Sequence, residues 1–203
     1  INLEILILGV LLIPFLTSLL LKFSGKYMNE LLTNFVTLNA SLLSVAISFF
    51  LFGYIFLDKF KPLKFELFEW FPDPQIVFEF YLDGLSGVMM VLISTLSLVI
   101  QLFSTSYMSK DEKYTKYFEY FNFFVFSMLL LVLSGNFLVM FFGWELVGLS
   151  SYLLISFWSE KKSASKAGNK AFILNRIGDF GFLIGLMMIL NYFETFNFLS
   201  IFE

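Results

Sequence analysis

The sequence predicts an all-α, polytopic integral membrane protein of about six transmembrane helices, with a small β-hairpin on the outer surface between helices 2 and 3. Composition is the first observation. Of 203 residues, 59% are apolar and 14% are charged, and the mean hydropathy is +0.84, whereas soluble domains are roughly 45–50% apolar and about 25% charged. The second observation is a series of six apolar runs, and the third is a short stretch with period-two alternation. Residues 1–203 are expected to form a single transmembrane domain.

Six runs are long and apolar enough to cross roughly 30 Å of hydrocarbon, which takes about 20 helical residues. They cover residues 5–21, 31–57, 84–109, 114–133, 137–158 and about 170–193. The Ser-Gly-Asn triplet at 134–136 separates the fourth run from the fifth, because Gly and Asn tolerate the positive φ of a tight turn. We expect Asp83 to cap the third helix, and Ser109 with Glu112 to form a capping box before the fourth.

The connection between the second and third helices is long and patterned. Residues 63–67 alternate between apolar and charged side chains, and residues 77–80 do so in part. Phe-Pro-Asp-Pro at 71–74 reads as the turn between them. This pattern favours a β-hairpin, with an irregular loop as the alternative.

Lysines are distributed unevenly among the connections, and this asymmetry predicts the orientation. The second connection holds three, Lys59, Lys61 and Lys64, together with five acidic residues. The odd-numbered connections hold nine: Lys22, Lys26, Lys110, Lys113, Lys116, Lys161, Lys162, Lys166 and Lys170. By the positive-inside rule, the odd connections face the cytoplasm or matrix, and both termini face the opposite side.

The composition also excludes several classes of function. The chain has no Cys and no His, which removes disulfides, thiolate or histidine metal sites and catalytic triads. A net charge of −3 gives no basic surface for nucleic acid. Carboxylates, Lys, Arg and Tyr are left as the groups able to move protons. The 30 phenylalanines suggest AT-rich coding and hence an organellar genome.

Glu145 is the most informative residue because it interrupts a stretch without formal charge from Tyr120 to Ser159. The fifth predicted helix is centred near Val147, so Glu145 lies about 3 Å from mid-membrane. An ionised carboxylate there costs at least about 2.5–3.5 kcal/mol. A cationic partner, a water-filled cavity or protonation must offset that cost. The residue is therefore either a proton-relay carboxylate or one half of a structural ion pair.

The sixth predicted helix carries a second polar group. Arg176 and Asp179 are three residues apart, so they can pair along the helix. Gly181 and Gly185 form a Gly-x-x-x-Gly pair typical of close helix packing. A functional role and a purely structural ion pair are both compatible with this pattern.

Four segments resemble one family. They are residues 80–86 (Phe-Tyr-Leu-Asp-Gly-Leu-Ser), 135–138 (Gly-Asn-Phe-Leu), 142–155, which includes Trp-Glu-Leu-Val-Gly-Leu-Ser-Ser-Tyr-Leu-Leu, and 170–179 (Lys-Ala-Phe-Ile-Leu-Asn-Arg-Ile-Gly-Asp). Their sequence and order are similar to the subunit 5 family of NADH dehydrogenase, the antiporter-like membrane subunits of respiratory complex I. The resemblance covers nearly the whole chain.

The resemblance implies a role for particular residues. Glu145 matches the fifth-helix glutamate of the proton channel, and Arg176 and Asp179 match a polar pair that couples neighbouring subunits or feeds the channel. Lys170 matches a basic residue at the start of the sixth helix. The resemblance also implies a place in the mitochondrial inner membrane with both termini on the intermembrane-space side. NADH, FMN, Fe–S clusters and ubiquinone would belong to other subunits, so no cofactor is expected in this chain.

The resemblance further implies partners. Members of the family are much longer, and their glutamate works with a lysine on a later helix. We therefore expect this chain to be a split-gene product or a truncated subunit, with the remaining helices on a second chain beside a neighbouring antiporter-like subunit. Lipids such as cardiolipin are expected at the lysine-rich connections. Two alternatives stay open: a structural membrane-arm subunit without proton transport, and a component of a multi-subunit cation/proton antiporter.

Overall fold

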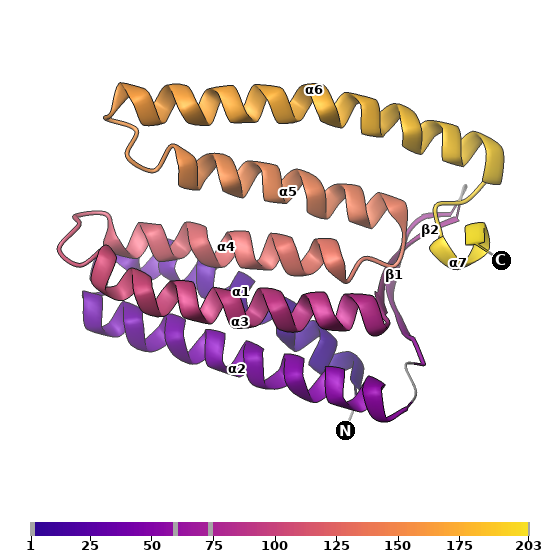
Figure 1. The fold of residues 1–203 in the computed structure, drawn as a ribbon, viewed down its shortest axis with the longest axis horizontal. Helices are drawn as coiled ribbons and strands as arrows, with labels where there is room; N and C mark the ends of the chain where they lie inside the picture. The colour runs from indigo at the N-terminus through magenta and orange to yellow at the C-terminus, as the bar shows by residue number, and fades with distance from the viewer. Residues whose placement is uncertain (1–2, 59–60, 73–74, 203) are drawn as a thin grey trace.

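The computed structural model describes residues 3–58, 61–72 and 75–202. Six long helices lie side by side, and a two-stranded hairpin crosses one end of the bundle (Figure 1). The elements in chain order are α1 (Leu3–Ser24), a 3-10 turn (Gly25–Tyr27), α2 (Glu30–Leu57), β1 (Leu63–Pro72), β2 (Gln75–Leu82), α3 (Gly84–Tyr107), α4 (Tyr114–Val132), α5 (Phe137–Ile155), α6 (Lys162–Phe193) and α7 (Phe198–Phe202). The predicted fold class is confirmed.

Five of these helices have the length and hydropathy of a membrane span, and α4 is the exception. Charged and polar residues at the start of α4, including Lys116 and Glu119, lower its mean hydropathy. The helix lies between α1, α3 and α5, so much of its surface faces protein and not lipid (Figure 1). An interior helix needs less apolar surface than a lipid-facing one, which explains why α4 can be more polar.

The sixth helix begins earlier than the sequence predicts. α6 starts at Lys162, eight residues before the expected position, and Lys170 lies two turns inside it. The additional turns carry Lys162, Lys166 and Lys170, which give no hydropathy signal although lysine is a good helix former. Apolar residues alone therefore underestimate the length of the sixth helix.

Helix caps follow local side-chain chemistry. Asn29, Asp83 and Asn136 cap α2, α3 and α5 by accepting a backbone N–H two or three residues into the helix, and Asp83 forms a full capping box with Ser86. The predicted cap at Asp83 is confirmed. The capping box expected before α4 is wrong, because α4 begins after Lys113, which makes no side-chain cap.

The hairpin is longer than its alternating segments indicate. β1 and β2 pair antiparallel from Leu63↔Leu82 to Pro72↔Gln75, with register shifts after Glu66 and Glu69. The shifts interrupt the alternation, which is why the sequence pattern covers only part of each strand. The expected turn at 71–74 falls partly within β1 and partly on residues 73 and 74, which lie outside the described residues.

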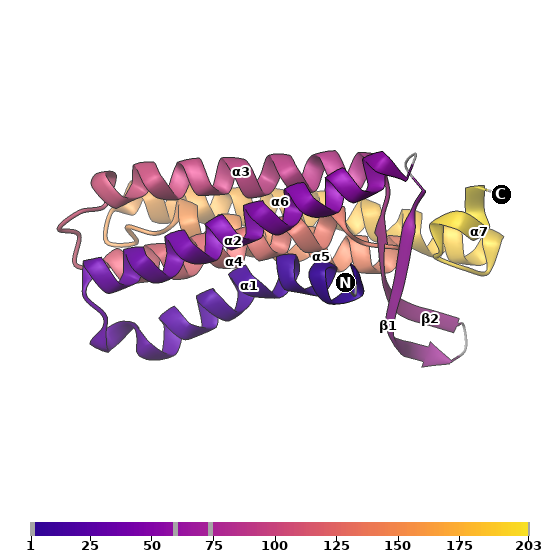
Figure 2. The same cartoon turned by 90° about the horizontal axis from the view of Figure 1, so that it is seen from below.

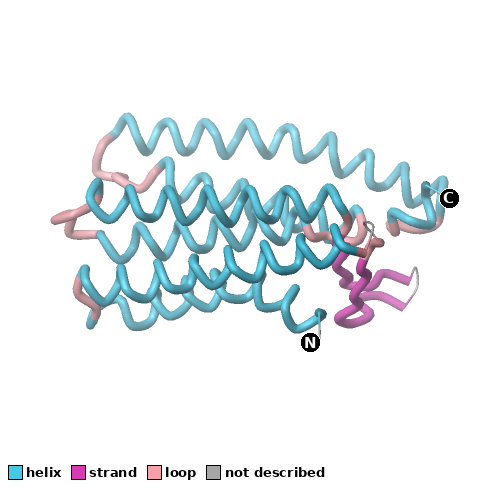
Figure 3. Tube along the Cα trace, turned by 60° about the horizontal axis from the view of Figure 1, so that its bottom comes forward, coloured by secondary structure: helices cyan, strands magenta, loops and turns pink. Residues whose placement is uncertain are grey.

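The two ends of the bundle differ. The chain's N-terminal end, the hairpin and α7 lie at one end, and the loops that carry most of the lysines lie at the other (Figure 2, Figure 3). The main hydrophobic core joins α1, α2, α3, α4 and the hairpin, and includes Val139 of α5. In contrast, the main packing partner of α6 among the long helices is α5, and within the described residues α6 buries 11% of its apolar window, against 39% for α3. The outer face of α6 is therefore open within this chain.

Candidate functional site

Glu145 projects from the middle of α5. It is one residue from the centre of this 19-residue helix, or about 1.5 Å along the axis. Asn136 fixes the start of the helix by accepting the backbone N–H of Val139 at 2.8 Å. The side chain of Glu145 is 17% exposed. A carboxylate is thus held at mid-span in a largely apolar helix.

Arg176 of α6 is the partner of this carboxylate. One guanidinium nitrogen, Nη1, donates a hydrogen bond to Oε2 of Glu145, and the two side chains form an ion pair between α5 and α6. The guanidinium also lies over the ring of Phe172, with Cζ 5.0 Å from the ring centroid. Because half of the Arg176 side chain stays exposed, the cation can reach beyond α5.

The pairing of Arg176 with Asp179 predicted from their spacing is wrong. Asp179, 7% exposed, instead accepts a hydrogen bond from the indole nitrogen of Trp144 at 2.9 Å. The spacing permits a contact within the helix, but α5 presents a carboxylate and an indole donor to α6. Tertiary partners therefore decide which group each charge contacts.

Two other expectations for α6 concern Lys170 and its glycines. Lys170 lies inside α6 and not at its start, six residues before Arg176 or about 9 Å along the helix. The close packing expected at Gly181 and Gly185 does not occur among the described residues, since a Cβ added at either position meets no atom within 4 Å. Their face of α6 is open.

A groove lies beside the pair, between α5 and α6. It has a volume of about 390 Å³ and is lined by Trp144, Leu174, Asn175, Gly178, Asp179 and Phe182. We call it the α5–α6 groove. It combines apolar walls with the carboxylate of Asp179, so it suits an apolar helix that carries a donor or a cation.

One polar cluster escaped the sequence reasoning. Glu79 in the hairpin, counted above only as one of several acidic loop residues, is 1% exposed and contacts Lys64 and Asn197. Only its position in a period-two segment, beside the apolar residues Phe78 and Phe80, hinted at its location.

These features define a multi-pass membrane protein with an ion-paired carboxylate inside the bundle. Ionisable groups at such depth are typical of proton or ion pathways. Two protein-family models match the chain: NADH-Ubiquinone oxidoreductase (complex I), chain 5 N-terminus, at residues 70–118, and NADH:quinone oxidoreductase/Mrp antiporter, TM, at residues 134–203. The chain belongs to the complex I chain 5 and subunit L family.

Known relatives agree with this membership. The chain is 38% identical over 195 residues to NADH-ubiquinone oxidoreductase chain 5 of Acanthamoeba castellanii, covering 95% of this chain and 29% of the relative. It is 39% identical over 191 residues to NADH-quinone oxidoreductase subunit L of Neisseria meningitidis serogroup B, covering 90% and 27%. The chain thus spans less than a third of the length of these relatives.

A solved structure has the same fold. A chain of the membrane-bound sulfane sulfur reductase, an archaeal respiratory membrane complex, superimposes with a TM-score of 0.83 at 20% identity. The match covers 96% of this chain and 38% of that chain. This likeness supports the bundle and the hairpin as an established arrangement.

Proposed function

We propose that this chain is a proton-translocating part of the membrane arm of complex I, NADH:ubiquinone oxidoreductase, and that Glu145 relays the proton. The observation that supports the proposal is the contact between Glu145, at the middle of a span, and Arg176 on the next helix. Membership in a family of complex I membrane subunits also supports a functional role for an intramembrane carboxylate.

In this mechanism, Arg176 controls the charge of Glu145. While the guanidinium is in contact, its positive charge balances the negative charge of the carboxylate, which remains ionised. When Arg176 turns away, which its half-exposed position allows, the isolated anion in hydrocarbon regains neutrality by binding a proton from water. The return of Arg176 then releases that proton. Asp179, held by Trp144, keeps a second negative charge close to the pair and attracts Arg176.

The charge balance of this site points to a second cation. Glu145 and Asp179 bring two negative charges, and Arg176 brings one positive charge. We propose that a lysine on one of the later helices of the subunit, beyond the part represented by residues 1–203, supplies the balance from the α5–α6 groove. Lys170 would act in coupling from its place toward the lysine-rich end of α6.

The setting follows the charge asymmetry of the two ends. We propose that the chain lies in the mitochondrial inner membrane, with the lysine-rich loops in the matrix and both termini and the hairpin in the intermembrane space. Its partners would be other membrane-arm subunits, including the neighbouring antiporter-like one, and anionic lipids such as cardiolipin at the lysine-rich end. NADH oxidation, with FMN, Fe–S clusters and ubiquinone, would occur in those other subunits.

The test is Glu145→Gln in the assembled complex, which keeps the shape of the side chain and removes the titratable proton. We expect normal assembly, NADH oxidation that continues or slows, and a lower ratio of protons pumped to NADH oxidised in sealed vesicles. Leu149→Met, one helical turn along α5, is a matched control that should leave the ratio unchanged. An unchanged ratio in Glu145→Gln would reduce Glu145 to a packing role.

A second candidate is a component of a cation/proton antiporter. It is favoured by one observation, the family model at 134–203, whose description includes the Mrp antiporter. Capture of the chain from gently solubilised membranes distinguishes the two. Recovery in a large NADH-oxidising assembly supports complex I, whereas recovery with only a few small membrane proteins supports the antiporter or a scaffold without transport.

A further inference from the structure

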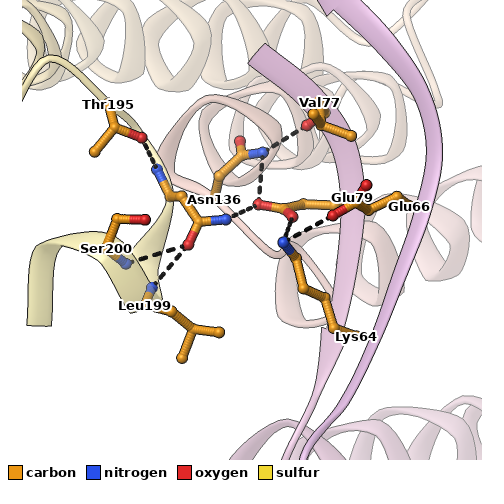
Figure 4. Close-up of polar contacts among 9 residues, drawn as sticks. Lys64, Glu66, Val77, Glu79, Asn136, Thr195, Leu199 and Ser200 are labelled. Atoms are coloured by element: carbon orange, nitrogen blue, oxygen red, sulfur yellow. Dashed lines mark hydrogen bonds and ion pairs between the residues drawn. The ribbon is translucent and has the colours of Figure 1, made fainter. Parts of the chain in front are cut away.

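The buried carboxylate of Glu79 connects three separate segments at the hairpin end of the bundle. Its Oε2 lies 2.9 Å from Nζ of Lys64 on the facing strand, and its Oε1 accepts from the side-chain amide of Asn197 at 2.5 Å and that of Asn136 at 3.4 Å (Figure 4). Lys64 also pairs with the more exposed Glu66 at 2.9 Å. Glu79 thereby joins the hairpin, the start of α5 and the segment that follows α6.

The two asparagines are oriented by the helices that they cap. Oδ1 of Asn136 accepts from the first turn of α5, and Oδ1 of Asn197 accepts from the backbone N–H of Leu199 at the start of α7 (Figure 4). With the amide oxygen turned toward a helix, the NH₂ group on the same carbon points away from it, and both NH₂ groups reach Glu79. The NH₂ group of Asn136 also donates to the carbonyl of Val77, at 2.7 Å. Oε1 of Glu79 accepts from both asparagines, and the second carboxylate oxygen, Oε2, is left to pair with Lys64.

Backbone contacts close the same cluster. The N–H of Gly135 donates to the carbonyl of Glu79 at 3.0 Å, and the N–H of Phe137 donates to the carbonyl of Phe196 at 3.0 Å. A Cβ at Gly135 would lie 2.6 Å from Cγ of Glu79, so any larger residue there displaces the carboxylate. The start of α5 and the end of the α6 segment are thus held to the hairpin by directional bonds.

This attachment matters because, apart from the polar contacts of the candidate site itself, Trp144 with Asp179 and Arg176 with Glu145, α6 packs on α5 through apolar and aromatic contacts. The stacked rings of Phe141 and Phe182 are an example. Apolar burial is non-directional, so these contacts tolerate sliding that hydrogen bonds do not. The pair of Glu145 and Arg176 spans the same two helices. A shift of α6 by one residue, about 1.5 Å, would disturb it.

We propose that Glu79 is a positioning residue that sets the alignment of α5 and α6, and through it the contact between Glu145 and Arg176. Its effect on alignment stands on the geometry alone, and its effect on proton transfer rests on the proposed function.

The experiment exchanges the carboxylate and the amide. Glu79→Gln removes the charge and leaves one acceptor where Glu79 offers two. Because both asparagines donate to Oε1 and Lys64 contacts Oε2, an amide at position 79 that still accepts from the asparagines turns its NH₂ group against the Lys64 ammonium. Asn197→Asp places two carboxylates face to face. In the double variant, the NH₂ group at position 79 can donate to the carboxylate at position 197 while the amide oxygen faces Lys64, and Asp is as good an N-cap as Asn. Glu69→Gln, on an exposed part of the same hairpin, is the matched control.

Alignment is measured without reference to transport. The chain has no native Cys, so Gly148→Cys with Asn175→Cys reports the position of α5 against α6 through a short bifunctional thiol reagent. A Cβ at Gly148 lies 3.8 Å from Nδ2 of Asn175. The proton-to-NADH ratio of the assembled complex is measured in the same membranes with the variants that lack the cysteines.

We expect each single variant to lower both the crosslinking yield and the proton ratio several-fold, and the double variant to recover both. The Glu69→Gln control should match the unmodified chain. Unchanged crosslinking in Glu79→Gln, or a double variant that accumulates normally without recovering, would overturn the positioning role. Reduced crosslinking with an unchanged proton ratio would support that role and overturn the proposed relay at Glu145.

Discussion

Replacing Arg176 by Met should destabilise the protein because it leaves the Glu145 carboxylate without its cation. Met keeps much of the length and apolar volume of the arginine side chain, so the lost quantity is the charge and its hydrogen bond to Glu145. We therefore expect the damage to depend on whether Glu145 can ionise.

The magnitude follows from the depth of the carboxylate. An ionised group at the centre of a span costs about 2.5–3.5 kcal/mol, and removing one partner of a buried pair costs about 3–5 kcal/mol. Glu145 is largely buried, but half of Arg176 is exposed, which favours the lower range. About 2.5–3 kcal/mol corresponds to roughly a hundredfold shift in the folding equilibrium.

The assay is a double-mutant cycle in native membranes. Resistance of the chain to proteolysis is followed during heating or titration with denaturing detergent for Arg176→Met, Glu145→Gln and the double variant. If the pair acts through charge, the double variant is more stable than Arg176→Met, because no unpaired charge is left. Lys170→Met, which removes a lysine distant from the pair, should have little effect. A double variant whose loss equals the sum of the single losses would refute the reasoning.

Three further predictions concern the packing of α5 on α4, the open face of α6 and the contact between α5 and α6. Gly143→Ala should lower the stability by about 1–3 kcal/mol in the same assay, since its Cβ would lie 2.8 Å from the α4 backbone. An unaltered stability would mean that α4 and α5 separate freely. Gly181→Leu should leave the stability of this chain unchanged yet reduce its recovery with partner chains on affinity capture, because its Cβ meets nothing within 4 Å; full recovery would show that this face contacts no partner. Trp144→Phe should cost about 1–3 kcal/mol by leaving Asp179 without its indole donor. A matching loss for Trp144→Phe in an Asp179→Asn background would contradict that assignment.

Much of the fold was predictable because membrane insertion imposes strong rules on the sequence. Apolar runs of the required length located all six long helices, and alternation located the hairpin. The boundaries were less accurate where hydropathy and helix formation diverge, as at Lys162–Gly168, which is helical without being apolar. α4 differs in the other direction: its start is polar, and neighbouring helices cover much of its surface in place of lipid.

The site was only partly predictable because charge pairing between helices is a tertiary property. The depth of Glu145 followed from its position in an apolar run, and the need for a cation followed from that depth. Helical spacing suggested Asp179 as the partner of Arg176, but spacing contains no information about which side chains α5 presents. Glu79 was missed for the same reason: its partners Asn136 and Asn197 are 57 and 118 residues away in the chain.

The open face of α6 and the charge of the site lead to one conclusion when taken together. A helix whose outer face contacts only lipid gains nothing from a half-exposed arginine such as Arg176, from a second buried carboxylate such as Asp179, or from glycines that meet no neighbour. Each of these is expensive or useless against hydrocarbon, and each is useful against another helix that approaches closely and brings a cation. The α5–α6 groove has the corresponding shape and the negative charge of Asp179. These features support the proposal that the polar site is half of an interface whose other half comes from later helices of the subunit.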